Sequence, residues 1–342
     1  MANNYTFPGN VNTYVPTLTE GLIIEYSRNP DSFPIAQYID YRPVDKMKGY
    51  YVRMKNDQQN RFINSQDAIW PDGNPAPDLL YGNDPFEFPQ YSCTRRAYTK
   101  KIGYLSVEQG SWDVLDQAAR LLAMDAMTFR SRRVHTTITT TGNYTAGNNL
   151  AAVATGGATW ANATSTTPSI RKTLMAAAIQ IQLNTLGSVK LKDLCVVINP
   201  NNAKVIATSQ EFIDFLKQSP TSLAVWMGTE QFVKYNIPPE LFGLNVTVDD
   251  TVYQNSQPSL TNTPTEVFSF PDNVAVVMTK KRAIAPAAGP AFSSYNAFVH
   301  EDLSTFVFNN PKDRLYDLQV VENVDTETYF APESACYIAT NS

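Results

Sequence analysis

One stretch of the chain, residues 111–135, constrains the fold more than any other. Apolar side chains recur there at steps of three and four, which places them on one face of a long α-helix. They are Trp112, Leu115, Ala119, Leu122, Ala126 and Phe129. Ser111 is predicted to cap the helix, with Asp113 in its first turn and the basic run from Arg130 to Arg133 at its end. A helix of about 25 residues spans roughly 37 Å, so the fold must provide an equally long surface for it.

The second half of the chain alternates helices with short apolar strands. A second helix is predicted at 168–186, with Pro168 in its first turn and Gly187 at its end. Shorter helices are predicted at 201–208, 210–218 and 228–236, and strands at 194–198, 244–248, 274–278 and within 316–339. Helices that alternate with apolar strands are typical of a sheet covered by helices. The predicted fold class is α+β.

The first third of the chain looks too extended to fold alone. Residues 1–35 are polar and aromatic without a period and are predicted to form an arm. Strands are predicted at 49–54 and 91–98, separated by an excursion whose segment 67–77 is dense in Pro, Gly and Asp. A long hairpin of this kind is unusual inside a compact monomer. We therefore expect it to reach a partner.

Composition excludes several classes of protein. The net charge of −5 and the pI of about 5.2 argue against a DNA-binding regulator, but they allow a container that encloses DNA. The start of the chain lacks the pattern of a signal peptide, and no apolar run approaches the length of a membrane span. The three cysteines, Cys93, Cys195 and Cys336, are widely spaced and are predicted to be buried thiols of a protein kept in a reducing cytoplasm.

The residue inventory does not indicate catalysis. Only two histidines exist, and His135 is predicted to complement the dipole just after the long helix. Adjacent carboxylates occur at Asp249-Asp250 and Glu301-Asp302, a pattern more typical of solvated turns than of acid–base chemistry. No catalytic, cofactor-binding or metal-binding residues are predicted. A β-rich carbohydrate-active enzyme is an alternative, and it would need two convergent carboxylates in a cleft.

Several passages, taken in order, resemble one family. Tyr91-Ser92-Cys93 leads through Ala97-Tyr98 to the long helix, and Ser165 to Arg171 opens the second helix. The strand from Leu194 ends at Asn199-Pro200, and Leu241 to Asp249 contains a Gly-linked strand pair. This order is similar to that of the major capsid proteins of tailed bacteriophages (Caudoviricetes), which have the Hong Kong 97-type fold. The resemblance covers nearly the whole chain.

The resemblance implies an organisation of the chain. Residues 44–98 would form the extended loop that lies over a neighbouring subunit, and residues 219–235 an axial loop. The implied parts are the N-terminal arm (1–35), the extended loop and strands (36–105), the peripheral domain with its spine helix (106–189), the axial domain (190–300) and C-terminal strands that return to the peripheral domain (301–342).

The resemblance also implies a function. The chain would be a structural subunit, and no enzyme, of an icosahedral head that encloses double-stranded DNA through non-specific contacts. It would assemble into pentamers and hexamers in the host cytoplasm and remain in the virion, with scaffolding, portal and decoration proteins as partners. Alternatives are an encapsulin-like nanocompartment shell and a tail or decoration protein. One member type forms a Lys–Asn crosslink, for which Lys46, Lys48 or Lys55 and Asn309 or Asn310 are candidates, but their spacing identifies no pair.

Overall fold

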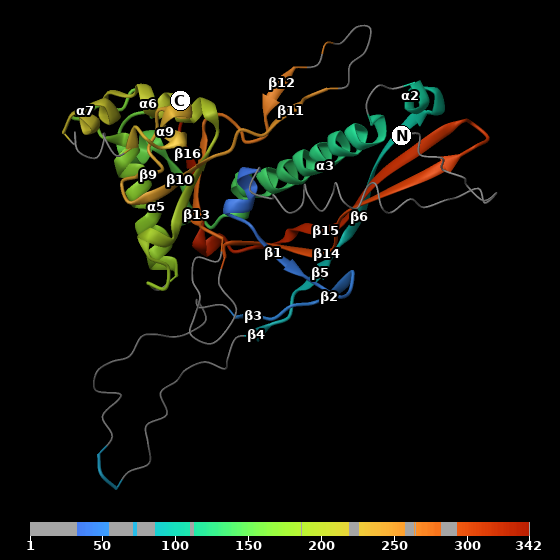
Figure 1. The fold of residues 1–342 in the computed structure, drawn as a ribbon. Helices are drawn as coiled ribbons and strands as arrows, with labels where there is room; N and C mark the ends of the chain where they lie inside the picture. Colours follow the sequence, from blue (N-terminus) through green and yellow to red (C-terminus); the bar gives the residue numbers. More distant parts are fainter. Residues whose placement is uncertain are drawn as a thin grey trace.

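The computed structural model describes residues 33–54, 71–73, 86–109, 113–185, 187–218, 226–256, 263, 265–281 and 293–341. Within these ranges the chain forms two regions, each built on one β-sheet (Figure 1). One sheet has four strands and packs against the long helix α3, and the other has six strands and carries most of the shorter helices. This mixture of sheets and helices confirms the predicted α+β class.

The four-stranded sheet is built on a long antiparallel ribbon. Across the sheet the strands are β1 (Asp40–Pro43), β14 (Tyr295–Asn310), β15 (Leu315–Phe330) and β6 (Thr94–Gly103). β1 runs parallel to β14, and the other neighbours are antiparallel. The register between β14 and β15 shifts at several points between Asn296 and Ser304. Shifts of this kind bend a ribbon and increase its twist.

Helix α3 (Val114–Thr139) packs against β15 and β6. Its small residues Ala119, Ala123 and Ala126 are fully buried, which lets the helix backbone approach the sheet closely. The N-cap is Asp113, whose side chain accepts a hydrogen bond from the Asp116 amide at 3.0 Å, so the prediction that Asp113 lies in the first turn is wrong. The predicted cap, Ser111, lies outside the described residues. A short helix, α2 (Tyr104–Gln109), precedes α3.

The end of α3 also differs from the prediction. The helix continues to Thr139, so the basic run from Arg130 to Arg133 lies inside it and does not close it. Several threonine hydroxyls of the last turns donate to carbonyl oxygens four residues earlier, for example Thr139 to His135 at 2.7 Å. Ile138 is fully buried and anchors this extra turn.

The six-stranded sheet has its most apolar strands at its centre. Its order is β7 (Asn149–Ala151), β16 (Cys336–Ala339), β13 (Val274–Thr279), β8 (Leu194–Ile198), β10 (Leu244–Val248) and β9 (Glu240–Leu241). Every residue of β8 and β13 is buried, which confirms two predicted strands. The helices of this region are α4 (Ala152–Gly156), α5 (Ser169–Asn184), α6 (Pro200–Thr208), α7 (Gln210–Gln218) and α9 (Glu230–Tyr235).

The six-stranded region takes its elements from separate parts of the chain. α5 and β7 come from the range 106–189, and β16 comes from 301–342, yet all three belong to the six-stranded region. A buried cluster also joins the two regions, with Val134 and Ile138 from α3, Val197 and Val276 from the six-stranded sheet and Val324 from the four-stranded sheet. The two regions therefore share a core.

Three short ribbons leave the two sheets. β2 (Lys48–Tyr50) pairs with β5 (Gln90–Ser92), β3 (Arg53–Met54) with β4 (Phe86–Glu87), and β11 (Val252–Gln254) with β12 (Glu266–Phe268). The first two form the stem of the predicted hairpin (Figure 1). Apart from residues 71–73, the distal part of the hairpin lies outside the described residues.

Single turns of 3-10 helix complete the fold. They are η2 (Pro34–Gln37), η4 (Thr141–Asn143), η5 (Ala146–Asn148), η6 (Leu191–Asp193) and η7 (Pro332–Ser334). The predicted arm, 1–35, lies outside the described residues except for its last three, of which Ile35 is fully buried. None of the helices in the described part of the chain has the length and hydropathy of a membrane span.

Candidate functional site

A buried charge cluster joins α3 to the four-stranded sheet. Glu322 on β15 is fully buried and accepts hydrogen bonds from Arg130 Nε at 3.0 Å and Arg133 Nη2 at 2.5 Å. Arg130 is 3% exposed and also contacts Asp302 on β14 at 2.9 Å. Burial acts to lower the pKa of Arg130, but the charges of Tyr41, Asp302 and Glu322 outweigh it and raise that pKa. Arg130 therefore stays charged in the core.

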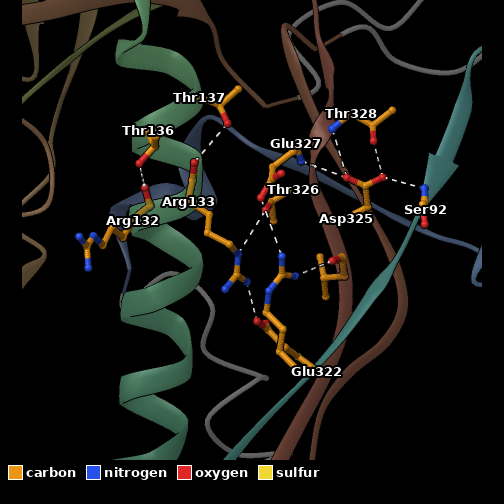
Figure 2. A network of polar contacts seen from close by, with 12 residues as sticks. Ser92, Arg132, Arg133, Thr136, Thr137, Glu322, Asp325, Thr326, Glu327 and Thr328 are labelled. Atoms are coloured by element: carbon orange, nitrogen blue, oxygen red, sulfur yellow. Dashed lines mark hydrogen bonds and ion pairs between the residues drawn. The ribbon is translucent and has the colours of Figure 1, made fainter.

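Arg133 extends this cluster toward the surface. Figure 2 shows its guanidinium reaching from α3 to Glu322 and Thr326 on β15. The hydroxyl of Tyr98 on β6 donates to the same Glu322 carboxylate at 3.1 Å. The cluster therefore joins α3, β6, β14 and β15, and it fixes how the helix lies on the sheet.

A second carboxylate, Asp325, holds the ribbon where the hairpin stem leaves it. It accepts hydrogen bonds from the amides of Ser92 at 2.9 Å, Glu327 at 3.0 Å and Thr328 at 3.1 Å (Figure 2). Ser92 is the last residue of β5 in the stem. This carboxylate, which is only 6% exposed, ties the hairpin stem to β15, and the packing of Tyr51 and Tyr91 against Phe298 on β14 adds to the contact.

A third polar group links α3 to the six-stranded region. His135 Nε2 lies 2.9 Å from Asp249 Oδ2, and Nδ1 lies 2.7 Å from Ser269 Oγ. Tyr38, from η2's C-cap, donates to the same Asp249 oxygen at 2.9 Å. Burial acts to raise the pKa of Asp249, but His135 and Thr251 outweigh it and lower that pKa to about 2. An ionised carboxylate only accepts, so Nε2 of His135 donates to it.

The role of this group is to join segments of the chain. Ser, His and Asp are the residue types of a hydrolase triad, but His135 is 1% exposed, and Tyr38 shares the Asp249 carboxylate. The prediction that His135 follows the helix and complements its dipole is wrong, because the residue lies inside α3 with its ring in the core. We name the three residues Tyr38, His135 and Asp249 the joint.

The predicted carboxylate pairs do not converge. Asp249 belongs to the joint, whereas Asp250 contacts Lys234 at 2.6 Å on the surface. Glu301 accepts from Ser304 Oγ at 2.9 Å, and Asp302 contacts Arg130. Within the described ranges, no group of three or more His, Cys, Asp or Glu side chains is placed to hold a metal ion.

The described residues include some of the crosslink candidates and all three cysteines. Lys48 lies in β2, and Asn310 donates to Asp313 at 2.9 Å within the turn that joins β14 to β15, while Lys55 lies outside the described residues. All three cysteines are buried, as predicted. Burial raises the pKa of Cys195 to about 12, so its thiol stays protonated.

The outer face of α3 carries exposed apolar side chains. Leu121, Met124 and Phe129 are each 44–47% exposed. Phe129 stacks on Tyr98 with ring centroids 5.7 Å apart, and an open hollow beside them is also lined by Arg132, Arg133 and Thr136. The prediction that Phe129 lies on the buried stripe is therefore wrong.

No protein-family model matches the chain, and no curated protein sequence matches it either. Among solved structures, a phage-related protein from Bordetella bronchiseptica is similar over 97% of this chain and 98% of its own, with 12% identity and a TM-score of 0.59. The mature capsid of bacteriophage PhiM1 (10% identity, 88% and 85% covered, TM-score 0.49) and an encapsulin from Synechococcus elongatus (9%, 98% and 92%, 0.44) are more distant.

The similarity to the phage-related protein, which covers nearly all of both chains, defines the class of fold. The chain has the Hong Kong 97-type fold, as the order of its elements predicted.

Proposed function

We propose that the chain is the major capsid protein of a tailed bacteriophage, the structural subunit of an icosahedral head that encloses double-stranded DNA. The observation that carries the proposal is the full-length similarity to a phage-related protein, at a TM-score of 0.59 over 97% and 98% of the two chains. A match over nearly the whole of both chains spans both sheets and the long helix between them, and is not confined to one region.

The described residues support a building role. The three polar groups around Glu322, Asp325 and Asp249 form hydrogen bonds within the fold. These bonds fix the helix α3, the hairpin stem and the six-stranded region relative to one another. Side chains on the stem are exposed, with Tyr50 at 71%, Val52 at 62% and Phe88 at 65%. Exposed apolar side chains on a projecting ribbon are typical of a surface that another chain covers.

The finer parts of the proposal concern assembly. Copies form pentamers and hexamers in the host cytoplasm, with scaffolding, portal and decoration proteins as partners. The extended loop lies over a neighbouring subunit. The packaged DNA is enclosed and touched only by non-specific contacts, because a net charge of −5 provides no basic excess to bind it tightly. The subunit remains in the virion.

Electron microscopy of the purified recombinant protein tests the proposal. Closed icosahedral particles of the wild-type chain are the expected result, in the presence of a scaffolding protein if the chain alone gives sheets or tubes. Monodisperse monomers under all these conditions would contradict it. Mass spectrometry of particles isolated from the native source separates a phage head, which contains portal protein and DNA, from a nanocompartment, which contains a cargo enzyme.

A further inference from the structure

The six-stranded region exposes apolar side chains at opposite edges of its sheet. β7 is the edge strand on one side and β9 on the other. Helix α5 packs against β7 and β16 at the first edge. Helix α9 directly precedes β9, and its Lys234 and Tyr235 contact Asp250, two residues after β10. The two helices thus lie at different edges of the sheet.

The outward face of α5 forms the first patch. Lys172, Met175, Ile179 and Leu183 recur at steps of three and four, so they share one face of the helix. Ile179 is 51% exposed and Leu183 is 65% exposed, and Lys172 is exposed at the N-terminal end of the same face. We name these four residues the α5 patch.

The second patch lies on and just before α9. Met227, Glu230 and Val233 are spaced by three residues. Met227 is 60% exposed, Val233 is 73% exposed, and the Glu230 carboxylate is exposed between them in the sequence. We name these three residues the α9 patch.

The two patches are complementary in charge and in apolar character. One carries a lysine and the other a glutamate, and both expose large apolar side chains that are stabilised by burial in an interface. Pairing either patch with its own copy would bring two like charges into one contact. A closed ring, in contrast, is built from head-to-tail contacts that use two different patches of each subunit.

We infer that the α5 patch of one copy contacts the α9 patch of the next copy around a ring of five or six subunits. This inference rests on the proposed function, because rings of copies are the units of such a shell. The inference specifies that the α5 patch contacts the α9 patch of the next copy. It also specifies that neither patch pairs with its own counterpart on another copy.

Introduced cysteines test the contact directly. All three native cysteines are buried, so a mild oxidant reaches the introduced surface thiols first. Shells of the double variant Leu183→Cys, Val233→Cys are expected to give a ladder from dimers to hexamers on a non-reducing gel. A mixture of the two single variants gives dimers only, and each single variant alone gives none. Crosslinking within a single variant, or monomers alone from double-variant shells, would overturn the inference.

A charge swap gives an independent readout. Lys172→Glu and Glu230→Lys each place like charges in the contact and are expected to reduce the assembled fraction at least ~10-fold, while the combined swap restores it. Lys312→Glu, in the exposed turn between β14 and β15, is the control and is expected to assemble normally. If wild-type shells form and neither single swap changes their yield, this inference fails while the proposed function stands. If the wild-type chain forms no shell, both fail.

Discussion

Glu322→Gln tests whether the charge cluster under α3 holds the fold together. The substitution keeps the shape of the side chain and removes its charge from a fully buried position between Arg130 and Arg133. Arg130, only 3% exposed, then keeps Asp302, whose carboxylate is 55% exposed. Removing one partner of a buried ion pair costs about 3–5 kcal/mol, and here the partly exposed Asp302 compensates the buried Arg130 charge less well than the buried Glu322 does.

The expected shift in melting temperature follows from the size of the chain. At about 2.1 cal/mol/K per residue, 342 residues give an unfolding entropy of about 0.7 kcal/mol/K. A loss of about 4 kcal/mol then lowers Tm by about 5–6 °C. Differential scanning calorimetry of the unassembled subunit measures this shift directly.

Glu327→Gln is the matched control on the same strand. Glu327 is 65% exposed and lies 3.8 Å from Arg96, so its ion pair is a surface contact. Such pairs contribute about 0–1 kcal/mol, which corresponds to a shift of less than about 1.5 °C. Equal shifts for the two variants, or no shift for Glu322→Gln, would refute the assignment of stability to the buried cluster.

Three further outcomes are expected. Deleting residues 60–85 leaves a cooperatively folded subunit that forms no stable shells, as seen by calorimetry and electron microscopy; normal particles would contradict the role of the hairpin. Ile138→Ala costs about 2–5 kcal/mol of unfolding free energy in a denaturant titration, whereas Phe129→Ala, at a position 44% exposed, costs less, and the reverse order would show that Phe129 is core. The lowered pKa of Asp249, about 2 against an ordinary 3.8, contributes about 2 kcal/mol that is present above pH 4 and lost as the pH falls toward 2. Asp249→Asn therefore flattens the decline of Tm between pH 4 and pH 2.5, and an unchanged decline would count against this source of acid sensitivity.

Regular elements with a clear period were predictable from the sequence. The helix at 168–186 and the strands at 194–198 and 244–248 appear close to their predicted bounds, because packing and local propensity agree there. β14 was missed, because its register shifts interrupt the alternation of apolar and polar residues. The last turn of α3 was missed because threonines favour other conformations, and here the burial of Ile138 and the hydroxyl bonds to the helix outweigh that preference.

The charge cluster could not be predicted, because its members lie far apart in the sequence. Arg130 and Glu322 are separated by 192 positions. One signal was nevertheless present. Arg130 follows Ala126 by four positions on the buried face of α3, and Glu322 continues the alternating positions of Leu318 and Val320 on β15. Two opposite charges, each on the apolar face of its own element, indicate that the two faces pack against each other.

The joint and the buried cluster between the two regions connect α3 to both sheets. α3 is held to the four-stranded sheet by Glu322 and to the six-stranded region by the bond between His135 and Asp249. Val134 and Ile138, one turn apart on the same helix, lie in the cluster that both sheets line. A displacement of the six-stranded region must therefore break this polar and apolar contact or move α3 with it. Because the Asp325 carboxylate ties the hairpin stem to β15, on which α3 rests, the six-stranded region, α3 and the hairpin stem are linked by one continuous series of contacts.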